Sequence, residues 1–402
     1  MITISFGAQP TSGEYHAIET EGRVRFLAGA CIALRSGPGG CSECVTACPV
    51  GAIQTTSAGN TVSAACIGCG ACAAACPSGA LIVKGFENPS PLPSSNIVRV
   101  ECRKVPGSVA GNNALRVPCL AGLSPSQWLV LAETVGNRRV TVVDRGWCAQ
   151  CTAASCSTPE HPARHALDQA DAILAEAGWT EMRRPHIEHD ALPASLMPAE
   201  IPTERPESLA RRAFFRRIGG EAQRAVGLSE PIETPTPRLM KQQGLPLPER
   251  ERLLAAAQRL AMSSGSTMPA APFAALSIAP NCNHFGICAG VCPTGALSLY
   301  EDDANAGLEF NAWRCIGCGQ CVKACPERAI SIHAAPQAPD PQVLQRLTAH
   351  AAKTCPACRK VFYGAAEAKT CQACLRNRQM GASLFGTMLA VNKSLKRILT
   401  RR

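Results

Sequence analysis

The alternation of apolar and polar positions predicts a small α/β unit over residues 97–180. Strand-like alternation covers three segments, which are residues 97–105, 114–119 and 139–144. Ser124 and Pro125 mark a helix start, and residues 128–135 supply the apolar face of that helix. Residues 165–178 have the pattern of a second amphipathic helix. Strands that alternate with helices predict a parallel sheet in this unit.

Outside this unit the pattern predicts fewer elements. Residues 24–27 alternate like a strand, residues 208–218 form a basic amphipathic segment, and residues 247–262 predict a helix. Pro, Glu and Arg are frequent in parts of residues 181–275, which we interpret as a partly ordered helical bridge. No uninterrupted apolar run of 18 residues occurs in the sequence, so no membrane-spanning helix is expected.

The composition changes this picture because cysteine is so frequent. The 402 residues include 24 Cys, 33 Gly and 31 Pro, whereas aromatic residues make up only 4%. With few aromatic side chains to bury, bound metal centres would replace part of the core. Residues 1–14 carry no secretory signature, and many Cys lie in C-x2-C groups. We therefore expect metal ligands in a cytoplasmic protein rather than disulfides.

Four cysteines in residues 66–77 carry the strongest chemical signal. They read C-I-G-C-G-A-C-A-A-A-C-P, and the same spacing returns in residues 315–326 as C-I-G-C-G-Q-C-V-K-A-C-P. Such a loop brings three thiolates to one iron–sulfur cluster and directs the fourth, which precedes Pro, to another cluster. The small-residue turn after each Cys-Pro predicts backbone N–H groups close to the sulfurs, where they tune the cluster potential.

A partial copy of this run precedes each complete one. In the first copy, C-x2-C-x3-C-P begins at Cys41, and Pro38 takes the place of the first Cys. We interpret Cys31 as the displaced ligand, with a free buried thiol as the alternative. The predicted ligand sets are Cys31, Cys41, Cys44 and Cys76 for cluster 1, and Cys48, Cys66, Cys69 and Cys72 for cluster 2. Residues 31–84 resemble the bacterial dicluster ferredoxins, which implies a ferredoxin-like module over residues 1–86.

The second partial copy begins at Cys282 and has Phe285 where the second Cys is expected. Cluster 4 has a complete ligand set, which is Cys292, Cys315, Cys318 and Cys321. Cluster 3 keeps three ligands, which are Cys282, Cys288 and Cys325. Such a set resembles that of the seven-iron ferredoxins and implies a 3Fe–4S centre. The alternative is a 4Fe–4S cluster with a non-Cys ligand, for which His284 is nearest in sequence. We assign residues 276–336 to this second dicluster module.

Five cysteines of the α/β unit follow its predicted strands, namely Cys102, Cys119, Cys148, Cys151 and Cys156. Ligands bind at the carboxyl ends of strands in open α/β sheets. The sequence V-P-C-L-A-G-L-S-P, followed by a strand and a Cys group, resembles the delta subunit of methyl-viologen-reducing hydrogenases. This resemblance implies a 2Fe–2S centre that passes electrons between partners. A zinc site, or a thiol pair at Cys148 and Cys151, is the alternative.

The C-terminal part contains two further C-x2-C pairs, formed by Cys355, Cys358, Cys371 and Cys374. Their separation predicts a zinc ribbon over residues 350–380, with a rubredoxin-like iron site as the alternative because both metals accept four thiolates. The net charge of the chain is +10, and residues 376–402 hold seven basic residues and no acidic one. Residues 381–402 are therefore interpreted as a basic tail, which either docks an acidic partner or is a solvated helix face.

The predicted fold class is α+β, with two ferredoxin-like dicluster modules flanking the α/β unit and a pair of zinc-ribbon-like knuckles after them. The sequence has no P-loop and no G-x-G-x-x-G after a strand, so it does not support a nucleotide or flavin site. We expect an electron carrier or oxidoreductase subunit with three or four 4Fe–4S clusters rather than an enzyme by itself.

Similar multi-cluster proteins serve molybdenum or tungsten enzymes such as formate dehydrogenase and nitrate reductase, and this resemblance implies redox partners of that class. Two other functions stay open. The chain could be an accessory or maturation factor for a molybdoenzyme, docking through its bridge and tail. It could also be a redox-sensing nucleic-acid-binding protein, although nucleic acid is the least favoured partner.

Overall fold

Residues 1–272 and residues 273–402 form two separate units in the computed structural model of the chain. Residues 16–17, 24–36, 40–56, 59–86, 92–110, 114–153, 161–196 and 245–378 are described. Cys156, the basic segment 208–218 and the basic tail 381–402 lie outside these ranges. No helix among the described residues is long and apolar enough to cross a membrane.

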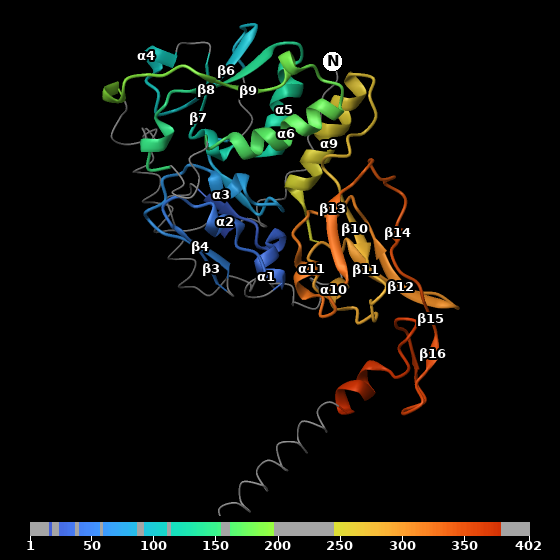
Figure 1. The fold of residues 1–402 in the computed structure, drawn as a ribbon. Coiled ribbons are helices and arrows are strands. Elements are labelled where there is room, and N and C mark those ends of the chain that lie inside the picture. Colours follow the sequence, from blue (N-terminus) through green and yellow to red (C-terminus); the bar gives the residue numbers. More distant parts are fainter. Residues whose placement is uncertain are drawn as a thin grey trace, which may run out of the picture. The chain divides into compact units, whose positions relative to one another are not determined.

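The first part of unit 1 is built from short strands and very short helices (Figure 1). Strand β2 (Val24–Phe26) pairs antiparallel with β1 (His16–Ala17) and β5 (Leu81–Val83), and β3 (Ile53–Thr56) pairs antiparallel with β4 (Gly59–Val62). The helices are α1 (Ile32–Ser36), α2 (Glu43–Thr46) and α3 (Ala71–Ala74), preceded by the 3-10 helix η1 (Ala28–Ala30). Helices of four or five residues present too little surface to build a core by themselves.

The second part of unit 1 is a parallel sheet in the strand order β7-β6-β8-β9. Its strands are β6 (Ile97–Cys102), β7 (Ala114–Val117), β8 (Arg139–Asp144) and β9 (His186–His189). The first three are the strands that the sequence predicts, whereas β9 was not predicted. Val98, Val100, Val140 and Val142 are fully buried. Continuous burial of this kind is typical of a parallel sheet that is covered on its faces.

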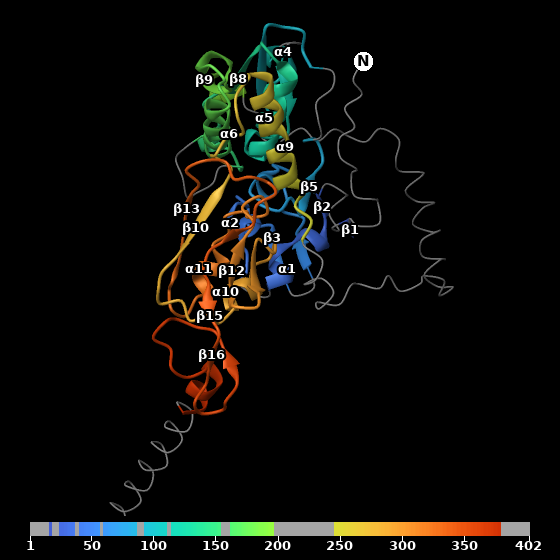
Figure 2. The same ribbon diagram turned by 90° about the vertical axis from the view of Figure 1, so that its right-hand side faces the viewer.

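Helices α5 (Pro125–Val135), α6 (Arg164–Glu176) and α9 (Pro248–Ser263) pack together beside this sheet (Figure 1 and Figure 2). Shorter helices are α4 (Gly107–Ala110), η2 (Leu120–Gly122), η3 (Cys148–Gln150), η4 (Glu181–Arg183) and η5 (Ala194–Leu196). Helix α5 starts at Pro125, where the sequence predicts a helix start. Ser124 and Gln127 form a capping box, in which the Ser124 N–H donates to Gln127 Oε1 at 2.9 Å.

The sequence predicts that residues 247–262 form a helix within a partly ordered bridge. The helix is present as α9, but it packs into the core of unit 1. Ala257 and Leu260 of α9 are buried in the same core as Trp128 of α5. Arg259 of α9 also forms an ion pair with a carboxylate of α5, Glu133, at 2.6 Å. Residues 245–272 are therefore a structural part of unit 1 rather than a connection between units.

Unit 2 repeats the strand pairing of the first module. Strand β10 (Ala274–Ile278) pairs antiparallel with β13 (Ile330–Ala334), as β2 does with β5, and β11 (Leu297–Glu301) pairs with β12 (Asn305–Phe310), as β3 does with β4. The helices are α10 (Ile287–Gly290) and α11 (Gln320–Ala324). Strands β14 (Gln345–Arg346) and β15 (His350–Ala351) add to β12, and β16 (Lys353–Thr354) pairs with β17 (Val361–Phe362).

Candidate iron–sulfur and metal sites

Eight cysteines of the first module line two cavities in unit 1. Cys31, Cys41, Cys44 and Cys76 line one cavity, and Cys48, Cys66, Cys69 and Cys72 line the other. Each cavity therefore contains one predicted ligand set, including the displaced Cys31. Burial, followed by the neighbouring Cys76 thiol, raises the pKa of Cys44 to about 11. Such a thiol stays protonated at neutral pH unless a bound metal stabilises its thiolate.

The cysteine before each Pro accepts a main-chain hydrogen bond from the first residue of the following strand or from the residue just before that strand. The four bonds run from Ala52 N to Cys48 Sγ (3.2 Å), Ala80 N to Cys76 Sγ (3.2 Å), Leu297 N to Cys292 Sγ (3.4 Å) and Ala329 N to Cys325 Sγ (3.3 Å). The prediction of N–H donors beside these sulfurs is confirmed. Such donors stabilise the extra negative charge of a reduced cluster and so shift its potential.

The cysteines of unit 2 gather in the same two sets that the sequence predicts. Burial, followed by the charges of Cys292, Cys315 and Cys318, raises the pKa of Cys321 to about 12. Burial also raises the pKa of Cys288, and the charges of Cys282 and Cys325 add to this effect. The structure thus brings together four thiols for cluster 4 and three thiols for cluster 3.

His284 lies beside the incomplete set and has an unusual backbone conformation. Its φ is 53°, in the left-handed region that Gly317 (φ 68°) occupies at the same place of the complete run. The His284 ring lies 5.4 Å from the ring of His350 and 6.0 Å from that of Tyr363. Its Nδ1 is buried and has no hydrogen-bond partner among the described residues. The ring therefore packs against His350 and Tyr363, and the unpartnered Nδ1, together with its position in the sequence, is what keeps His284 a candidate fourth ligand.

Four cysteines of the middle group meet at the carboxyl ends of the parallel strands. Cys102 ends β6, Cys119 follows β7, and Cys148 and Cys151 follow β8. Burial raises the pKa of Cys119, and the charge of Cys102 raises it further. Burial likewise raises the pKa of Cys148 to about 12. The structure brings these four thiols to one edge of the sheet, as predicted for strand ends, whereas Cys156 lies outside the described residues.

Two further side chains beside the middle group were missed by the sequence analysis. They are Asp144 and His161, which form a close group with Cys148. Each of the three residues offers one ligand atom, and these atoms lie within 4.8 Å of one another. The Nε2 atom of His161 is buried and makes no hydrogen bond to another described residue. Asp144 could have been suspected because it ends a predicted strand, but no spacing rule points to His161. These residues offer nitrogen, oxygen and sulfur ligands next to the four thiols.

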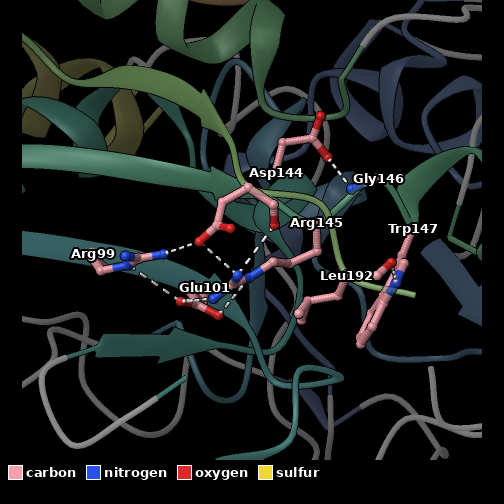
Figure 3. A network of polar contacts seen from close by, with 8 residues as sticks. Arg99, Glu101, Asp144, Arg145, Gly146, Trp147 and Leu192 are labelled. Atoms are coloured by element: carbon pink, nitrogen blue, oxygen red, sulfur yellow. Dashed lines mark hydrogen bonds and ion pairs between the residues drawn. The ribbon is translucent and has the colours of Figure 1, made fainter. Parts of the chain in front are cut away.

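A buried ion-pair network holds this edge of the sheet (Figure 3). Glu101, which directly precedes Cys102, is fully buried and pairs with Arg145 at 2.8 Å. Arg145 and Arg99 both pair with Asp190 at 2.8 Å. The network therefore ties together β6, the loop after β8 and the residue after β9, which are the segments that position the middle cysteines.

The cysteines of the predicted ribbon have a tighter geometry than the other cysteine groups. The Sγ atoms of Cys355, Cys358, Cys371 and Cys374 lie within 4.8 Å of one another. Sulfurs about 2.3 Å from one tetrahedral zinc ion have a comparably short separation. A main-chain N–H from Cys371 lowers the pKa of Cys355 to about 6, which favours its thiolate. Among the described residues, no other group of three or more cysteines is as tight.

Comparison with known sequences agrees with this geometry. Two sequence families, each described as a 4Fe–4S dicluster domain, match residues 39–81 and residues 276–326. The second range contains all seven predicted ligands of unit 2. The first range contains seven of the eight predicted ligands of the first module, because Cys31 lies outside it.

Two known proteins are similar to parts of the chain. Protein NrfC of Escherichia coli strain K12 is 29% identical over 123 residues, which is 30% of this chain and 46% of NrfC. The arsenate respiratory reductase iron–sulfur subunit ArrB of Shewanella sp. strain ANA-3 is 45% identical over 56 residues, which is 13% of this chain and 23% of ArrB. The chain thus spans less than half the length of these relatives. Together with the cysteine groups, the matches identify the chain as an iron–sulfur protein with two 4Fe–4S dicluster domains.

Proposed function

We propose that this chain carries electrons between an oxidoreductase and its redox partner. The observation that supports this most directly is the arrangement of eight cysteines around two cavities in unit 1. Burial raises the pKa of Cys72, which lines one cavity, and the charge of Cys44, which lines the other, raises it further. The two sets are therefore close in space. Iron–sulfur clusters bound there would supply one-electron transfer. The chain provides their thiolate ligands and the N–H donors that tune their potentials.

The ligand assignment follows the grouping of the thiols. Cluster 1 is held by Cys31, Cys41, Cys44 and Cys76, cluster 2 by Cys48, Cys66, Cys69 and Cys72, and cluster 4 by Cys292, Cys315, Cys318 and Cys321. Cluster 3 is held by Cys282, Cys288 and Cys325. We assign cluster 3 as a 3Fe–4S centre because three thiols gather there. A 4Fe–4S cluster with His284 as the fourth ligand is the second candidate, which the unpartnered Nδ1 of His284 favours.

The two remaining groups take different metals. The four thiols Cys102, Cys119, Cys148 and Cys151 would hold a 2Fe–2S centre, because they meet at one edge of the sheet and no three of them have the close spacing of a single-ion site. The ribbon has that close spacing and would hold structural zinc. Its role is to stabilise the fold of residues 350–380 rather than to transfer electrons.

The partner is proposed from chemistry and from similarity. ArrB is by name the iron–sulfur subunit of a respiratory reductase, which suggests that this chain also serves a larger reductase or dehydrogenase. A molybdenum or tungsten enzyme is the class that we propose. We place the chain in the cytoplasm because free thiols and iron–sulfur clusters persist in reducing compartments.

The test is anaerobic purification of the whole chain, followed by quantification of iron, acid-labile sulfide and zinc and by electron paramagnetic resonance. The assignment above gives about 17 iron atoms per chain and roughly one zinc. The variant Cys66→Ser is expected to lower the iron content by about four atoms, whereas Ser63→Ala, at a nearby exposed position, should leave it unchanged. Absence of labile sulfide, or zinc in all cysteine groups, would contradict electron transfer.

A further inference from the structure

The turn that carries Cys119 lies directly against the loop that carries Cys69 of cluster 2. This turn is η2, which starts one residue after Cys119. A Cβ atom placed on Gly122 would lie 2.6 Å from the carbonyl oxygen of Cys69. A Cβ atom placed on Gly70 would lie 2.9 Å from the Cα atom of Gly122. Both backbones thus approach to a distance that only glycine permits at these positions.

The Phe86 ring packs against both glycines of this contact. Its ring atoms would lie 2.4 Å from a Cβ atom on Gly70 and 2.1 Å from one on Gly122. The ring is buried, and the Phe86 carbonyl oxygen accepts a hydrogen bond of 2.8 Å from Gln127 Nε2. Because Gln127 is also part of the capping box of α5, the helix fixes the contact. The Phe86 ring and the capped start of α5 therefore hold the two loops at this short separation.

Cys119 is the member of the middle group that lies close to Cys69 of cluster 2. Burial raises the pKa of Cys119 first, and the charges of Cys102 and Cys69 raise it further. Cys102 belongs to the middle group, and Cys69 lines the cavity of cluster 2. Helix α3, which carries Cys72 of cluster 2, contacts both η2 and α2, and α2 carries Cys44 of cluster 1. Cluster 2 is therefore close to the middle group as well as to cluster 1.

We propose that the contact of Gly122 with the Cys69–Gly70 loop is the junction through which electrons pass between the middle centre and cluster 2. This inference rests on the proposed iron–sulfur function of both groups. One electron leaves one centre and enters the other, while no bond or proton is exchanged. Gly70 and Gly122 are positioning residues, since their missing side chains set the separation.

The test compares Gly122→Ala with the control Gly107→Ala, whose added Cβ would meet only an Arg116 guanidinium nitrogen at 3.4 Å. The chains are reduced with dithionite, and electron paramagnetic resonance follows the power saturation of the slowly relaxing 2Fe–2S signal. A nearby reduced 4Fe–4S cluster speeds the relaxation of that signal. The wild type and Gly107→Ala should show this enhancement. Gly122→Ala should lose part of it at equal iron and sulfide content, and an unchanged enhancement at equal content overturns the proposal.

A second pair of variants keeps the test decisive if Gly122→Ala does not incorporate its iron. Cys66→Ser removes a ligand of cluster 2, and Cys41→Ser removes a ligand of cluster 1. The relaxation enhancement should be lost in the first variant and retained in the second. The reverse result would overturn the proposed junction, but it would not contradict the proposal that the chain carries electrons. Absence of a 2Fe–2S signal in the wild type would refute the assignment of the middle centre itself.

Discussion

Replacing Glu101 with glutamine tests how the edge of the parallel sheet is held together. Glu101 is fully buried in β6, and its carboxylate accepts hydrogen bonds from Arg145 at 2.8 and 3.3 Å. Arg99 adds a weaker contact at 3.6 Å. Glutamine has the same shape but no charge. Among the residues that the structure describes, Arg145, which is 7% exposed, then keeps one carboxylate partner, Asp190.

The magnitude follows from what remains around Arg145. Removing one member of a buried ion pair typically costs about 3–5 kcal/mol, because the other charge is left uncompensated. Asp190 still contacts Arg145 at 2.8 Å, but its side chain is 47% exposed and solvent weakens the pair. We therefore expect a loss of about 3 kcal/mol, at the lower end of that range. The double variant Glu101→Gln/Arg145→Met removes the stranded charge and should recover most of this loss.

Hydrogen exchange measured by mass spectrometry reports this change locally. Amides of β6 and β8 should exchange roughly 100-fold faster in Glu101→Gln, since each 1.4 kcal/mol corresponds to about a factor of ten. Strands β11 and β12 of unit 2 serve as the internal control and should not change. Unaltered exchange in β6 and β8, or a double variant that exchanges faster than the single one, would refute the reasoning.

Three further predictions concern other parts of the chain. Phe285→Cys completes the run of cluster 3 and should raise the iron content by about one atom, with loss of the 3Fe–4S resonance signal. Cys358→Ser should remove the ribbon zinc, measured by atomic spectroscopy, and leave the iron content unchanged. The hydrogen bond from Arg99, helped by the charge of Arg145, holds the pKa of Asp190 below its ordinary value. The ionised Asp190 therefore stabilises the fold above about pH 4, and this stabilisation is lost as the pH falls through the lowered pKa. Hydrogen exchange of the β9 amides, measured as a function of pH in wild type and Asp190→Asn, reports the loss.

Each of these predictions has a clear contrary result. An iron content unchanged by Phe285→Cys, with the 3Fe–4S signal retained, would show that position 285 does not face the cluster. Zinc retained in Cys358→Ser would mean that the ribbon is not a four-thiolate site. If Asp190→Asn and the wild type lost protection in β9 at the same low pH and to the same degree, Asp190 would not be the titrating group.

The sequence is most informative where spacing alone brings ligands together. A C-x2-C-x2-C loop is so short that its thiols must converge, and the cavities of unit 1 are lined accordingly. Cys31 is harder to predict, because it lies ten positions before Cys41. Only the missing position of the run points to it. The parallel strands β6, β7 and β8 were also predictable, since each alternates apolar and polar positions.

The remaining features depend on contacts between distant segments. Amphipathic periodicity shows that α9 packs on something, but not that its Leu260 shares a core with Trp128 of α5. His161 follows β8 by many residues, and only the fold places it beside Asp144. Likewise, Gly122 carries no motif of its own. Its role depends on the backbone of Cys69, which lies more than 50 residues earlier in the sequence. Periodicity and spacing describe local geometry and leave such pairings open.

The low aromatic content and the frequent cysteines have one structural explanation. In unit 1, Cys31 and Cys72 are members of the same hydrophobic core as Phe26, Val100 and Trp128. The first module has helices of four or five residues, so its ligand cysteines occupy positions that apolar side chains fill elsewhere. Because this core continues from the cysteines into the sheet, the metal sites and the α/β unit stabilise one another. A cluster bound at these cysteines is then both an electron carrier and a part of the core.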